Sequence, residues 1–119
     1  MRRVVVETPF AGDRDRHLGY LRRCLRDCLA RGEAPFASHA IYPQVLDDND
    51  PVERNLGLEA GMVWGELAHA TVVYTDFGIS DGMKVGIEHA KRSGREIEYR
   101  NLKRAAVADR HNEDAGRTV

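Results

Sequence analysis

RVVVETPFAGD, residues 3–13, leads from a strand into the start of a helix. Residues 3–7 are a β-branched run without polar alternation, which is typical of a strand buried on both faces. Residues 8–12 contain proline and glycine, which end such a strand. Asp13 is a residue type that is favoured at a helix N-cap. This stretch therefore predicts the first β–α unit of a parallel sheet.

The same alternation of strand and helix continues along the chain. Helices are predicted from 14 to about 31, from 51 to about 67 and from about 82 to 93, and further strands at 34–42, 70–75 and 96–99. The order predicts an α/β fold: a three-layer, doubly wound sheet of four to five mainly parallel strands with helices on both faces. The first and second helices are expected to bury two apolar stripes: Leu18, Leu21, Leu25, Cys28 and Leu29 in one, and Leu56, Ala60, Val63 and Leu67 in the other.

Composition restricts the class of protein. The chain has 119 residues, with 18 basic and 19 acidic side chains and a formal charge of −1. This balance argues against a binder of nucleic acid polymers or of membrane surfaces. Apolar runs are too short for a membrane span or a signal peptide, so a cytoplasmic location is expected. One domain is expected over 1–100, followed by a charged tail over 101–119 that is partly disordered.

Cysteine and histidine give no sign of a metal site or a cofactor. Cys24 and Cys28 lie four residues apart in the first predicted helix, and no second pair or nearby histidine completes a ligand set. The simplest interpretation is two reduced thiols at the edge of the core. We therefore expect no metal and no cofactor.

Three loops are the candidate ligand site, because ligands of such folds lie outside the carboxyl ends of the strands. They span 8–13, 39–50 and 75–82. The ligand-binding residues predicted from them are Thr8, Pro9, Phe10, Ala11, Gly12, His39, Tyr42, Asp76, Gly78, Ser80, Gly82 and Met83.

Each loop also has a structural interpretation. The first and third loops lead into helix N-termini, which favour an anion or a ribose, but any β–α turn has this form. Ser80 is suited to an N-cap. Asp76 and Asp81 are suited to sugar hydroxyls, or equally to solvated loop positions. His39, at a strand end, is suited to a hydrogen-bonded structural role.

Several segments together resemble a small family of actinobacteria and their phages, domain of unknown function 7768. They are GEAPFASH (32–39), VLDD (45–48), VYTD (73–76), GISDGM (78–83) and IEYR (97–100). That family in turn resembles the nucleoside 2-deoxyribosyltransferase-like group. The resemblance implies the same fold and a nucleoside or nucleotide ligand.

The transferases cleave an N-glycosidic bond with two carboxylates, a nucleophilic Glu and an acid. The resemblance assigns the Glu to Gly86 and the acid to Ser80, so neither carboxylate is present here. Glu7 and Asp81 are the nearest carboxylates to these positions. If the chain is an enzyme, we expect Glu7 as the acid and Asp81 as the nucleophile.

Three functions remain open on this basis. The first is a nucleoside- or nucleotide-binding protein that has lost the chemistry of the transferases. The second is an N-glycosidic bond hydrolase or transferase with relocated carboxylates. The third is a phage accessory protein that binds a host partner. Because related transferase folds assemble into dimers or larger oligomers, a homodimer or higher homo-oligomer is expected.

Overall fold

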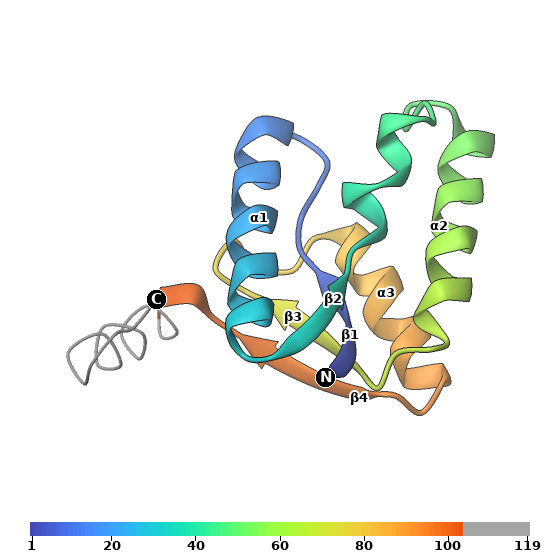
Figure 1. The fold of residues 1–119 in the computed structure, drawn as a ribbon. Coiled ribbons are helices and arrows are strands. Elements are labelled where there is room, and N and C mark those ends of the chain that lie inside the picture. Colours follow the sequence, from blue (N-terminus) through green and yellow to red (C-terminus); the bar gives the residue numbers. More distant parts are fainter. Residues whose placement is uncertain (104–119) are drawn as a thin grey trace.

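Four parallel strands form one sheet in the order β2-β1-β3-β4 in the computed structural model, which describes residues 1–103 (Figure 1). The strands are β1 (Arg2–Glu7), β2 (Glu33–Phe36), β3 (Ala70–Tyr74) and β4 (Glu96–Arg100). Helices α1 (Arg14–Ala30), α2 (Pro51–Gly65) and α3 (Asp81–Arg92) connect them. The predicted doubly wound α/β class is confirmed, with four strands. The strand order reverses between β1 and β3, so the first and third loops adjoin.

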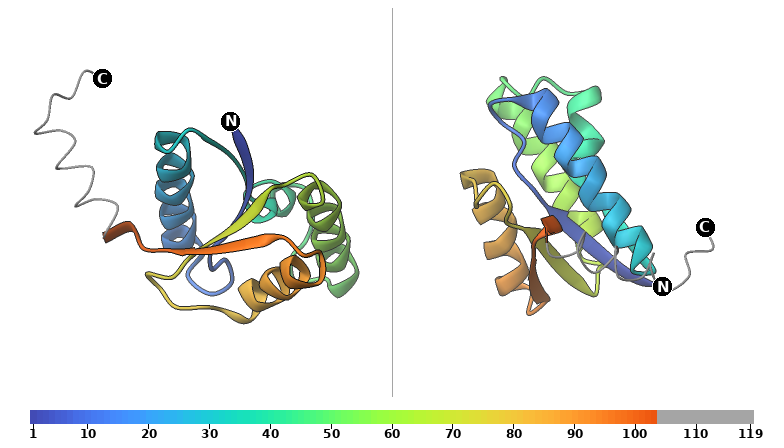
Figure 2. Two further views of the ribbon diagram at one scale, coloured as in Figure 1. Left: turned by 90° about the horizontal axis from the view of Figure 1, so that it is seen from below. Right: turned by 90° about the vertical axis from the view of Figure 1, so that its left-hand side faces the viewer.

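Helices cover both faces of the sheet, with α1 on one side and α3 on the other (Figure 2). Successive residues of β1 point to opposite faces. Val4 and Val6 belong to the core cluster under α1. Val5 and Glu7 therefore face α2 and α3, where a β-carbon on Gly65 would lie 3.4 Å from Val5 Cγ2. The last residue of the first strand thus places a carboxyl group on the α3 side of the sheet.

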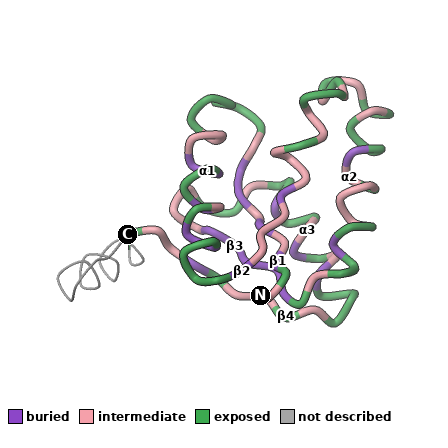
Figure 3. The backbone as a smooth tube through the Cα atoms, viewed as in Figure 1, coloured by how far each residue is buried: buried purple, intermediate pink, exposed green. Residues whose placement is uncertain are grey.

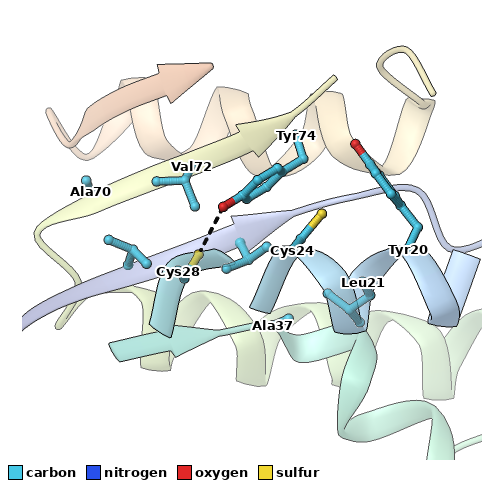
Figure 4. Close-up of a cluster of buried hydrophobic side chains, with 10 residues drawn as sticks. Tyr20, Leu21, Cys24, Cys28, Ala37, Ala70, Val72 and Tyr74 are labelled. Carbon is cyan, nitrogen blue, oxygen red and sulfur yellow. Dashed lines mark hydrogen bonds between the residues drawn. The ribbon is translucent and has the colours of Figure 1, made fainter. Parts of the chain in front are cut away.

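The larger core cluster lies between α1 and the sheet (Figure 4). Tyr20, Cys24 and Cys28 pack there against Tyr74, and the Cys28 Sγ to Tyr74 hydroxyl distance is 3.4 Å. Both cysteines are free and fully buried, inside the core rather than at its edge. Burial raises the pKa of both thiols, so they remain protonated and unreactive.

Helix α2 packs in the opposite way to its predicted stripe. Leu56, Val63 and Leu67 are more than half exposed, whereas Gly57 and Gly65 are buried. The helix lies close to its neighbours through a glycine face: a β-carbon on Gly61 would lie 2.7 Å from Ser38 Cβ. Figure 3 shows most of the α2 backbone as exposed or intermediate. Periodicity located a helix correctly but assigned its buried face wrongly, because the small residues pack and the large ones do not.

The predicted strand over 34–42 is shorter than expected. Strand β2 ends at Phe36, and two 3₁₀ turns follow, η1 (Ser38–Ala40) and η2 (Tyr42–Gln44). The strand lies at a sheet edge and pairs only with residues 2–5 of β1, so no partner strand extends it. The turns bring His39 and Tyr42 toward α2 instead of continuing the sheet.

A buried ion pair fixes the two sheet edges beneath the end of α1. The Arg100 guanidinium donates to both carboxylate oxygens of Glu33 at 2.7 Å and to Glu98 at 2.7 Å. Arg2 contacts the same two carboxylates. Hydrogen bonds from Arg100 hold the pKa of Glu33 below its ordinary value. The network joins β1, β2 and β4, so it stabilises the sheet rather than a ligand site.

The predicted tail over 101–119 lies almost entirely outside the described residues. Within residues 1–103, none of the helices has the length and apolar content needed to cross a membrane.

Candidate functional site

A cavity of about 440 Å³ lies between α2, α3 and the carboxyl end of β1, and we name it the α2–α3 cavity. Its volume falls within the range of roughly 300–1,000 Å³ that is typical of small-molecule sites. It continues down the α3 side of the sheet, past Val5 and as far as Arg95. The polar side chains that line it are those of Glu7, Thr8, Ser38, His39, Tyr42, Asp48, Glu53, Arg54, Ser80, Asp81, His89 and Arg95.

Glu7 is the central polar group of this cavity. It ends β1, and the alternation of the strand turns it toward α3. Burial raises the pKa of the Glu7 carboxyl to about 8, and the nearby positive charge of Arg95 offsets only part of that effect. Among the described residues none donates a hydrogen bond to this carboxyl. This pKa favours the neutral acid form of Glu7 at pH 7, and its carboxyl lies in the wall of the cavity without a hydrogen-bond donor from residues 1–103.

Gly86 of α3 makes room for the Glu7 carboxyl. A β-carbon placed on Gly86 would overlap the carboxyl carbon and both oxygens of Glu7. The carboxyl group therefore occupies the space into which any side chain at position 86 would project. Gly86 therefore packs against the carboxyl end of β1.

Thr8 and His39 form a second polar pair in the cavity wall. The Thr8 Oγ1 to His39 Nε2 distance is 2.6 Å, and Thr8 is only 4% exposed. Burial lowers the pKa of His39 to about 4, so the imidazole is neutral at pH 7. Phe10 packs edge-on against the imidazole at 6.0 Å between ring centroids. This arrangement fixes the His39 ring, and it offers hydrogen bonding without charge.

Arg95 and His89 complete the inner end of the cavity. The Arg95 guanidinium donates from Nε to Thr71 Oγ1 at 2.9 Å and from Nη1 to the Gly65 carbonyl at 2.6 Å. His89 lies three residues after Gly86 on α3, and its Nε2 is buried with no hydrogen-bond partner among residues 1–103. A buried nitrogen without a partner is costly unless a ligand or water pairs with it.

The structure brings most of the predicted site residues together. Those that line the cavity are Glu7, Thr8, Phe10, Ala11, His39, Tyr42, Ser80, Asp81, Gly82 and Met83. Those that do not line it are Pro9, Gly12, Asp76 and Gly78. Ser80 is the N-cap of α3, and its hydroxyl accepts from the Met83 backbone at 3.3 Å.

The two aspartates of the third loop lie elsewhere than expected. Asp76 turns to the α1 side, where its carboxylate accepts from the Tyr20 hydroxyl at 2.6 Å and from the Leu102 backbone at 3.0 Å. Asp81 is the first residue of α3, and its side chain is fully exposed at the cavity rim, 3.6 Å from Lys84 Nζ. Asp76 thus has a structural role, and Asp81 points to solvent.

The sequence patterns did not indicate that α2 and the segment before β4 contribute to the cavity. Gly57, Gly61 and Gly65, spaced four apart, line the cavity and let α2 approach the η1 turn. A glycine at every fourth position is the sequence pattern that indicates such a close-packed helix face. The prediction instead placed the apolar stripe on the opposite face in the core. Arg95 and His89 carry no motif, and their place in the cavity depends on how α3 packs on the sheet.

Among the described residues no three His, Cys, Asp or Glu side chains lie close enough to hold a metal ion. The chemistry that the cavity offers is that of a neutral acid, two imidazoles and a guanidinium.

Comparison with known protein families matches residues 2–100 to Domain of unknown function (DUF7768). The chain belongs to the DUF7768 family. No curated protein sequence matches this DUF7768 chain. A solved structure with a similar fold is a 2-deoxyribosyltransferase from the psychrotolerant bacterium Bacillus psychrosaccharolyticus. The TM-score is 0.65 at 12% sequence identity, over 83% of this chain and 72% of that chain. At this identity the likeness shows the fold of the DUF7768 chain and not its activity.

The raised pKa of Glu7 predicts that folding stability falls as pH rises. The folded-state pKa is about 8 against an ordinary value of 4.5, so the stabilisation is complete below pH 4.5 and is lost progressively up to about pH 8. Because glutamine does not ionise, the Glu7→Gln variant does not lose this stabilisation as pH rises. The Tm of the variant minus that of the wild type is expected to be larger at about pH 8 than at about pH 5.

His39 acts in the opposite direction, because its lowered pKa costs stability as pH falls from 6.5 to about 4. That contribution is common to both proteins and cancels in the difference. A Tm difference that does not change with pH would contradict the neutral state of Glu7.

Proposed function

We propose that this protein binds a nucleoside or nucleotide in the α2–α3 cavity without carrying out transferase chemistry. The observation that carries the proposal is a cavity of nucleoside size with the unpaired Glu7 carboxyl and the unpaired His89 nitrogen at its inner end. A mostly apolar pocket with a few converging polar groups is the usual form of a small-molecule site. The fold shared with a 2-deoxyribosyltransferase supports a ligand of the nucleoside class.

A thermal-shift screen tests this proposal, because a ligand that binds only the folded state raises the Tm. The panel is the common ribonucleosides, deoxynucleosides and their 5′-monophosphates. At least one is expected to raise the Tm of the wild type, and Glu7→Met is expected to reduce or abolish that shift. Glu88→Gln is the matched control, since Glu88 lies on the exposed side of α3 and pairs with Arg92. A panel without any shift would contradict the proposal.

The second candidate is cleavage of an N-glycosidic bond, and one observation favours it. The Glu7 carboxyl fills the space beside Gly86, the position to which the family resemblance assigns the nucleophilic Glu. A neutral Glu7 is suited to protonating a departing base while water adds to the sugar carbon. Asp81 is a poor nucleophile candidate, because its side chain points to solvent.

Release of free base from the same nucleosides and nucleotides separates the two candidates. The binding proposal predicts a Tm shift with no released base. Base release by the wild type that is lost in Glu7→Gln and retained in Asp81→Asn would establish the second candidate and assign the acid to Glu7.

We also propose that the chain forms a homodimer or higher homo-oligomer through α2. Val52, Leu56 and Val63 lie on α2 and Leu67 lies two residues after its end, and each is at least 56% exposed. Covering these side chains removes apolar area from water. Leu56→Glu is expected to shift the protein toward monomer in sedimentation velocity, whereas a monomeric wild type would contradict the proposal.

A further inference from the structure

The inner end of the α2–α3 cavity holds a carboxyl group that the protein leaves without a partner. The Glu7 carboxyl lies against the backbone of Gly86, and no hydrogen bond reaches it from residues 1–103. The cation whose charge acts on Glu7 is Arg95, and its guanidinium donates instead to Thr71 and to the Gly65 carbonyl. The cavity therefore presents the acid to whatever ligand enters it.

The groups around Glu7 decide its protonation state. On α3 the facing titratable group is His89, just before β4 it is Arg95, and from the η1 turn it is His39, which is neutral. Glu53 and Arg54 of α2 line the cavity but are not among the groups that shift the pKa of Glu7. Arg95 in turn interacts with Glu66 as well as with Glu7. A buried carboxylate that accepts no hydrogen bond is costly, so the acid form is the one that fits this site.

A carboxylic acid offers a donor and an acceptor side by side. The O–H donates to a ring nitrogen, and the C=O accepts from an adjacent amino group. Adenine and cytosine present such an amidine-type edge, with a ring nitrogen beside an exocyclic amino group. If the proton moves part of the way from Glu7 to the ring nitrogen, Glu7 gains carboxylate character, which the positive charge of Arg95 stabilises. The hydrogen bond between Glu7 and the ring nitrogen is then stronger. Guanine instead presents two donors side by side, a ring N–H and an amino group, and these match the two acceptor oxygens of an ionised carboxylate.

We propose that Glu7, in its acid form, recognises the amidine-type edge of adenine or cytosine at the inner end of the cavity. This inference rests on the proposed function, because it names the base within the nucleoside class. It also places the base inward, toward Arg95, and the sugar toward the cavity mouth, where Ser80 and Asp81 lie.

Isothermal titration calorimetry with adenosine, cytidine, guanosine and purine riboside tests the inference. Purine riboside lacks the amino group of adenosine. Adenosine or cytidine is expected to bind wild type at least roughly tenfold more tightly than purine riboside or guanosine do, as for the loss of one buried hydrogen bond to a polar site. Glu7→Gln keeps a donor and an acceptor and is expected to keep the preference. Glu7→Met is expected to lose it, while the control Glu88→Gln behaves as wild type.

The pH dependence of the affinity gives a second readout. Wild-type affinity for the preferred nucleoside is expected to fall severalfold between about pH 7 and pH 9, as the acid with a pKa of about 8 loses its proton. Glu7→Gln is expected to show a flat profile over the same range. Binding that is independent of the base and of pH would overturn the inference and leave the proposed function intact. A complete lack of nucleoside binding would overturn the proposed function.

Discussion

Replacing Arg100 by alanine is expected to lower the free energy of unfolding by about 3–5 kcal/mol. The Arg100 side chain is 6% exposed and that of Glu33 is 8% exposed, with two contacts of 2.7 Å between them. Removing the guanidinium leaves Glu33 as a buried carboxylate whose remaining cation, Arg2, is one-third exposed. Urea unfolding of wild type and variant at neutral pH measures the difference.

Arg92→Ala is the matched control for that variant. Arg92 pairs with Glu88 on the surface of α3, where its side chain is 77% exposed. Surface pairs contribute little, so a change below about 1 kcal/mol is expected. A loss of similar size in both variants would contradict the view that the Arg100 network fixes the sheet.

Gly86→Ala is expected to destabilise the protein by about 1–3 kcal/mol, although alanine is the better helix former. The added methyl group would overlap the Glu7 carboxyl and push it out of its position. The double variant Glu7→Ala/Gly86→Ala restores the space, so it is expected to be more stable than Gly86→Ala alone. A double-mutant cycle by urea unfolding measures this coupling.

Gly19→Ala is the control for the change in helix propensity. Gly19 lies within α1, and a β-carbon there meets no atom within 4 Å. It is expected to gain up to about 1 kcal/mol. An equal gain in the free energy of unfolding for Gly86→Ala would show that Glu7 does not occupy the space beside Gly86.

The sequence was most informative at the ends of strands and the starts of helices. The β-branched run before Glu7, the N-cap Asp13 and the N-cap Ser80 each mark an element that the structure contains. These signals are local, because a cap or a turn depends on a few neighbouring residues. The loops that follow β1 and β3 adjoin for a different reason, because these two strands are parallel neighbours in the sheet that the order of elements predicts.

Which face of an element meets the site was harder to predict. Glu7 reaches the cavity because β1 turns its odd-numbered residues toward α3, and Asp76 misses it because its carboxylate pairs with Tyr20 on the α1 side. Helix α2 buries Gly57 and Gly65 and exposes Leu56. These outcomes depend on contacts between residues far apart in the chain, which hydrophobic periodicity does not encode.

Backbone amide chemical shifts show whether a nucleoside or nucleotide occupies the α2–α3 cavity. Glycine amides give well-resolved signals, and Gly57, Gly61, Gly65, Gly82 and Gly86 all line the cavity. Titration of the ¹⁵N-labelled protein with adenosine and with its 5′-monophosphate is expected to shift these signals together with those of Glu7 and Thr8. Gly19 and Gly32, which lie outside the cavity, are expected to stay unchanged. Shifts confined to α1, or no shifts at millimolar ligand, would contradict binding of a nucleoside or nucleotide in the α2–α3 cavity.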